Sequence, residues 1–81
     1  MNPMDTDRLK RQYARIFSLM MDGRWRTLGQ ISGTTQDPPA SVSAQLRHMR
    51  KPEFGSHTVG KRCLGRGLYE YQLQVNQMEN A

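Results

Sequence analysis

The fold is decided by residues 38–51, which read Pro38-Pro39-Ala40-Ser41-Val42-Ser43-Ala44-Gln45-Leu46-Arg47-His48-Met49-Arg50-Lys51. Asp37, directly before them, can accept hydrogen bonds from the free N–H groups at a helix start, and Pro38 sits where a missing N–H costs nothing. Val42, Leu46 and Met49 are four and three residues apart, which places them on one face of an α-helix. The stretch therefore predicts a helix that is packed on one side only.

The opposite face of this helix carries small residues near its start and cations toward its end. At about 100° per residue, that face holds Ala40, Ser41, Ala44, Arg47, His48 and Lys51. Small side chains let a helix approach another surface closely, and cations attract phosphates. In a basic chain this pattern is typical of a helix that reads the DNA major groove.

The charge of the chain is concentrated in its middle. The 81 residues carry a net charge of +5, and 36% of them are hydrophobic, which fits one domain with a small core. Between Gly23 and Gly67 there are eight lysines and arginines against two acids. This distribution favours a polyanionic partner, although solubility alone is the simpler explanation for a basic protein.

Upstream of residue 38 the sequence predicts two more helices. Residues 9–20 place their apolar side chains at helical spacing, behind a cap at Asp5 or Thr6, and Asp22-Gly23 ends the helix. Arg24–Thr27 is short and extended in character, and is a candidate third strand. Thr27 then caps a second short helix over Leu28–Gly33, and a turn over 33–37 makes this pair a helix-turn-helix.

Downstream, the sequence predicts a β-hairpin. Pro52 stops the third helix after Lys51. Strands are expected over His57–Cys63 and Leu68–Val75, joined by a turn at Leu64–Gly67. The second strand alternates polar and apolar residues. The predicted domain covers residues 5–75, with flexible ends at 1–4 and 76–81.

Four segments carry a resemblance to a known family: Asp22–Ile31, Pro39–Arg47, Arg50–Gly55 and Tyr69–Leu73. With them the chain resembles the small winged helix-turn-helix proteins of bacteriophages and prophages, over most of residues 9–74. The resemblance implies an α+β winged helix, with three helices and a C-terminal hairpin wing. It also implies duplex DNA as partner and the cytoplasm of a bacterial host cell as location. The Ser- and Ala-rich start of the third helix departs from strong base readers, which often carry Arg, Asn or Gln there.

Candidate DNA-binding residues lie on the third helix and on the hairpin. They are Ser41, Ser43, Ala44, Gln45, Arg47, His48, Arg50, Lys51, Lys61, Arg62 and Arg66. Arg47 is the best candidate for a bidentate guanine contact, and a phosphate contact is the alternative. Arg50 and Lys51 suit phosphates, and they also complement the helix dipole. Arg66 stands between two glycines, where a flexible tip can insert a cation into a narrow groove, or simply be solvated.

Enzyme chemistry finds little support in the sequence. His48, His57 and Cys63 lack the spacing of zinc ligands, and Gly65-Arg66-Gly67 is too short for a phosphate loop. Cys63 is expected to be a small packing residue. No catalytic residue, metal, cofactor or membrane segment is predicted.

Two functions remain from the sequence. The first is duplex DNA binding in transcription regulation or another phage DNA transaction. The second is an interaction module, an adaptor or inhibitor whose basic face meets an acidic host or phage protein. The sequence leaves the oligomeric state open between monomer and homodimer.

Overall fold

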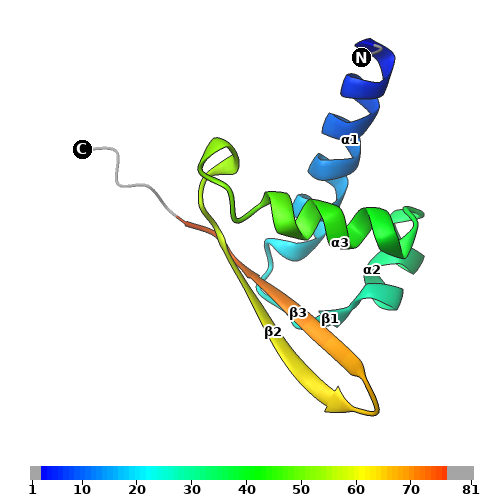
Figure 1. Cartoon of the computed structure of the whole chain (residues 1–81), viewed down its shortest axis with the longest axis vertical. Helices are drawn as coiled ribbons and strands as arrows, with labels where there is room; N and C mark the ends of the chain where they lie inside the picture. The colour runs from blue at the N-terminus through cyan, green and yellow to red at the C-terminus, as the bar shows by residue number, and fades with distance from the viewer. Residues whose placement is uncertain (1–2, 77–81) are drawn as a thin grey trace.

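Three helices and a three-stranded antiparallel sheet make up the α+β fold (Figure 1). The structure, a computed structural model, describes residues 3–76. Its elements are α1 Pro3–Met20, β1 Arg26–Thr27, α2 Leu28–Thr35, α3 Pro39–His48, the 3-10 turn η1 Pro52–Phe54, β2 Thr58–Gly65 and β3 Leu68–Gln74. This is the element order that the sequence predicts, and it is compatible with a winged-helix-like topology.

The core draws on all three helices and both long strands. Its buried apolar side chains are Ile16, Met20, Ile31, Val42, Leu46, Met49, Val59 and Leu73. Burying one such side chain stabilises a fold by about 1.5–3 kcal/mol, so each amphipathic element is fixed by its own apolar face. The helical spacing of α3 is confirmed by this set, and that of α1 by Ile16 and Met20, with Tyr13 and Phe17 packed against the core. Leu9, which begins the predicted apolar face of α1, is 43% exposed and lies outside the core.

The N-terminus of α1 differs from the prediction, whereas its C-terminus agrees with it. The helix begins at Pro3, so Asp5 and Thr6 lie within it and are not its cap. Gly23 takes a left-handed φ of 79° and its N–H donates to the Met20 carbonyl at 3.1 Å, as expected of a helix terminator. Residues 1–2 and 77–81 of the expected flexible ends lie outside the described residues.

Thr27 caps α2 as predicted. Its hydroxyl accepts from the Gln30 N–H at 3.1 Å, and the Gln30 side chain accepts from the Thr27 N–H at 2.9 Å. The helix runs two residues past Gly33 to Thr35, because Gln36 rather than Gly33 takes the left-handed position, with φ 67°.

The predicted cap of α3 is wrong. The helix begins at Pro39 without any side-chain cap, and it ends at His48 rather than at Lys51. Asp37 is buried, and its carboxylate accepts hydrogen bonds from Arg15 and Gln12 of α1. The full positive charge of Arg15 attracts this carboxylate more strongly than the partial charges of a helix start.

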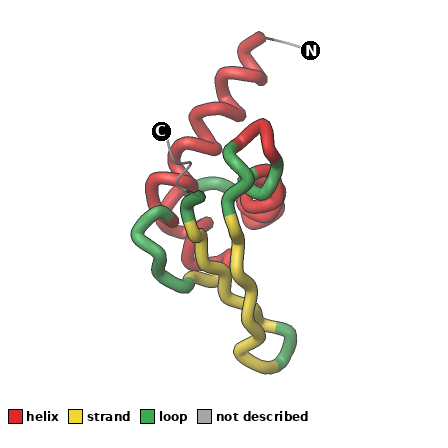
Figure 2. Tube along the Cα trace, turned by 90° about the vertical axis from the view of Figure 1, so that its left-hand side faces the viewer, coloured by secondary structure: helices red, strands yellow, loops and turns green. Residues whose placement is uncertain are grey.

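The candidate third strand is present, and the sheet order is β1-β3-β2. β1 pairs with β3 through Arg26 and Tyr71, while β2 pairs with β3 along nearly its whole length. Arg66 and Gly67 form the turn with φ 53° and 75°, both left-handed, as two-residue hairpin turns require. The hairpin end extends away from the helices (Figure 2).

Candidate nucleic-acid interface

α3 has one buried face and one open face. Val42, Leu46 and Met49 are buried in the core, as the spacing predicts. Arg47 is exposed on the other side, and Ser43 is half-buried one turn before it. The three buried side chains thus fix the rotation of the helix and decide which residues face outward.

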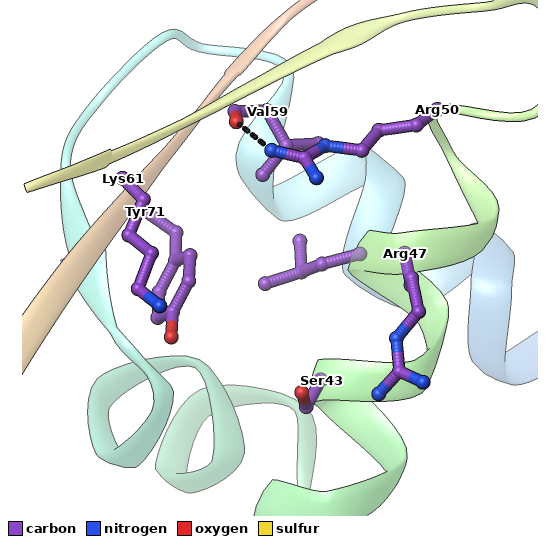
Figure 3. Close-up of a pocket in the computed structure, with 7 residues that line it drawn as sticks. Ser43, Arg47, Arg50, Val59, Lys61 and Tyr71 are labelled. Atoms are coloured by element: carbon purple, nitrogen blue, oxygen red, sulfur yellow. Dashed lines mark hydrogen bonds between the residues drawn. The ribbon is translucent and has the colours of Figure 1, made fainter.

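A groove of about 190 Å³ lies between this helix and the hairpin (Figure 3). It is lined by Ser43, Leu46, Arg47, Arg50, Val59, Lys61 and Tyr71. The strand register sets Lys61 directly opposite Tyr71. In Figure 3 both side chains extend from the strands into the space beside α3, with Ser43 and Arg47 across from them.

The groove is positively charged, because three cations and no acid line it. Arg50 Nη2 donates to the Val59 carbonyl at 3.0 Å, which holds that guanidinium against the hairpin. Arg47 and Lys61 take part in none of the ion pairs found within residues 3–76. No acid therefore neutralises either charge, although the Lys61 Nζ also lies 4.3 Å from the centroid of the Tyr69 ring.

The two faces of the hairpin carry different cations, since neighbouring residues of a strand point in opposite directions. Lys61 faces the groove. Arg62 lies over the ring of Trp25, 4.3 Å from its centroid, and its Nη2 is 2.8 Å from Glu70 Oε1. The sequence groups Lys61 and Arg62 as one basic tip, and the structure separates them.

Gln45 is not available as a base reader, contrary to the expectation. Only 3% of it is exposed, and its Nε2 donates to Gln12 Oε1 of α1 at 2.8 Å. His48 is also turned toward this side. Its Nδ1 lies 3.2 Å from Gln45 Oε1, and its ring stacks on Phe54 with 5.4 Å between centroids. Both side chains stabilise the contact of α3 with its neighbours.

Four of the eleven candidate residues come together in the groove, namely Ser43, Arg47, Arg50 and Lys61. Ser41 and Ala44 are half-buried on α3 and do not line the groove, and Lys51 is exposed after the helix end. Arg66 is exposed at the hairpin turn.

Tyr71 lines the groove but is not among the candidate binding residues predicted from the sequence. Alternation along β3 places it on one face with Tyr69 and Leu73, which is a usable signal. Its position opposite Lys61 depends on the register, and that register shifts at a bulge between Cys63 and Gly65. A bulge inserts one residue without a pattern that the sequence reveals.

Residues 3–76 hold no cluster of three or more His, Cys, Asp or Glu side chains that suits a metal ion. Over the same residues, no helix has the length and apolar character needed to cross a membrane.

Cys63 is exposed, so the expectation that it packs inside is wrong. Burial raises the pKa of Tyr13, which lies outside the groove lining.

Comparison of the chain with protein-family models, with curated proteins and with solved structures gave no match.

Proposed function

We propose that this chain is a small winged-helix protein of the phage type, and that it binds double-stranded DNA. The role would be transcription regulation or another phage DNA transaction in the cytoplasm of a bacterial cell. The observation that carries the proposal is the groove of Arg47, Arg50 and Lys61 between an outward-facing helix and a projecting hairpin. A cationic groove of this kind fits a phosphate backbone.

In the proposed complex α3 enters the major groove, which is about 12 Å wide and admits one α-helix. Ser43 and the exposed Ala40 allow close approach at the helix start. Arg47 then reaches a base edge or a phosphate, while Arg50 and Lys61 hold the phosphate strand that passes between helix and hairpin. Most hydrogen bonds in such complexes go to the backbone, so affinity would come first from these cations.

The test is an amide NMR titration of the labelled protein with a mixed-sequence duplex, at low and at physiological salt. We expect shifts at Ser43, Arg47, Lys61 and Arg66 that weaken as salt rises. Three phosphate contacts give a slope of log K against log salt of about −2.7. Absence of any shift at low salt would exclude duplex DNA as the ligand.

The interaction module, expected to use the same basic face, remains the second candidate, and an aromatic surface elsewhere on the molecule also favours it. Phe54 is 39% exposed, and its ring lies 5.0 Å from Tyr13 and 5.4 Å from His48 between centroids. Aromatic side chains of this kind are enriched in protein interfaces. Shifts confined to this aromatic surface on addition of a host or phage protein, with none from DNA, would favour this function.

A further inference from the structure

The end of the hairpin gathers apolar side chains in solvent. Leu64, Leu68 and Tyr69 are 49%, 52% and 38% exposed. They make up three of the six large hydrophobic residues that are exposed within the described part of the chain. Single exposed hydrophobics are ordinary, but Leu64 and Leu68 flank the turn of a projecting end, where a partner can cover them. Tyr69 points to the opposite face from Leu68, and the Lys61 Nζ lies 4.3 Å from its ring centroid.

These side chains lie too far from the core to be covered by it. The hairpin is anchored by the pair of Val59 and Leu73, the buried residues of its two strands. Lys61–Gly65 of β2 are all exposed. Gly65 lies six positions after Val59, which corresponds to about 20 Å of strand. Figures 1 and 2 both show this end standing free of the helices.

The tip is narrow and its two leucines are close to it. Gly65 pairs with Leu68 directly beside the two-residue turn, and Leu64 is the residue at which the register shifts. Gly65, Arg66 and Gly67 all have positive φ, and two of the three are glycines without side-chain bulk. The end of the hairpin is therefore a thin loop with apolar flanks.

The charges around the hairpin tip indicate which kind of partner could bind there. Lys61 and Arg66 form none of the ion pairs found in residues 3–76, whereas the nearby acid Glu70 is bound to Arg62. An apolar tip beside positive charges that no acid neutralises suits a partner with anions outside and stackable apolar groups inside. Duplex DNA has that composition, and apolar side chains that wedge between base steps kink it.

We propose that Leu64 and Leu68 enter the minor groove and wedge a base step, so that the protein bends the DNA it binds. This inference rests on the proposed duplex binding. One turn of B-DNA is about 34 Å, so the neighbouring minor groove lies about 17 Å along the axis from a helix in the major groove. The part of the hairpin beyond Val59, about 20 Å long, is long enough to span this distance.

The test uses a short duplex with a donor and an acceptor dye at its two ends. Energy transfer reports bending, and anisotropy of the same duplex reports binding. With saturating wild-type protein we expect both signals to rise, since wedges of this type kink DNA by about 20–90°. The variant Leu64→Ser/Leu68→Ser should keep most of the binding and lose most of the increase in energy transfer.

The matched control is Leu9→Ser, which alters a comparably exposed leucine (43%) on α1, away from the hairpin. It should bend DNA as the wild type does. Both leucines of the tip are outside the core, so thermal melting should show the double variant folded.

Three outcomes would overturn the inference. Binding without any change in energy transfer would exclude bending and leave the proposed function standing. Equal bending by the double serine variant would exclude the leucines as its cause. No anisotropy change at low salt, together with binding to vesicles containing phosphatidylserine, would make the tip a membrane contact and would reject duplex binding as well.

Discussion

Arg15 and Asp37 form a two-point ion pair that joins α1 to the connection between α2 and α3. Arg15 Nη2 lies 2.6 Å from Asp37 Oδ1, and Arg15 Nε lies 3.2 Å from Oδ2. The two side chains differ in exposure, 46% for Arg15 and 6% for Asp37. If the pair breaks, the arginine can regain water, whereas the carboxylate stays buried.

This asymmetry predicts that Arg15→Ala is more harmful than Asp37→Ala. Removing the arginine leaves a buried carboxylate without its counter-charge, and we expect the larger of the two losses in the free energy of unfolding, although solvent screens an arginine that is 46% exposed. Removing the aspartate forfeits charged hydrogen bonds that the half-exposed arginine can replace with water, a loss of about 1.5 kcal/mol. Urea unfolding of both variants measures the difference. Equal losses would mean that the carboxylate is not desolvated in the folded chain.

The same pair predicts how stability depends on pH. The hydrogen bonds from Arg15 hold the pKa of Asp37 below its usual range, against the opposing effect of burial. A lowered folded pKa gives stability that is complete above the unfolded value of about 3.9 and is lost as the pH falls through the folded pKa. Wild type should therefore lose stability on acidification, and the deficit of Arg15→Ala relative to wild type should shrink.

Thermal melts of the two proteins at a series of acidic pH values check this prediction. Asp22, whose pKa is also lowered, first of all by the hydrogen bond from Arg26, is unchanged in both proteins and cancels in the comparison. A deficit that stays constant with pH would place the origin of the Arg15 effect in packing rather than in the charge of Asp37.

Arg47 and Arg62 offer a matched test of the groove, because each substitution removes one positive charge. Arg47→Ala should weaken duplex binding and reduce the salt slope by about 0.9, without loss of stability. Arg62→Ala should leave binding nearly unchanged and cost about 1 kcal/mol of stability, from its contact with Trp25 and the exposed pair with Glu70. Anisotropy titrations at several salt concentrations, with melts alongside, separate the two. Equal losses of affinity would indicate unspecific attraction by net charge.

Much of the fold could be predicted from the sequence because its signals are local. The apolar spacing of α3, the Thr27 cap and the glycines at the hairpin turn each act within a few residues. Asp37 shows where local reasoning fails, since a carboxylate before a proline looks like a cap until Arg15, 22 positions away in the chain, is brought beside it.

The candidate site was predictable to a lesser degree, for the same reason. A helical wheel places Gln45 on the flank of α3. Only the position of α1 shows that the Gln45 side-chain amide donates a hydrogen bond to Gln12. Alternation along β2 separates Lys61 from Arg62, but the direction in which each points depends on where Trp25 and α3 lie. The directions of these side chains are determined by contacts between segments that are distant in the chain, and a single sequence does not reveal such contacts.

Arg66 allows stability and binding to be separated at one position. Its φ of 53° is left-handed, a conformation that costs an ordinary residue about 1–2 kcal/mol and glycine nothing. Arg66→Gly removes that strain but frees the unfolded chain, an opposing effect of about 0.4–1 kcal/mol. We therefore expect a free energy of unfolding that is unchanged or raised by up to about 1.6 kcal/mol, with weaker DNA binding. Arg66→Lys keeps the charge and the strained backbone, so it should bind nearly as the wild type does. Urea unfolding and anisotropy on the three proteins test this, and undiminished binding by Arg66→Gly would show that the hairpin turn contributes no contact to the duplex.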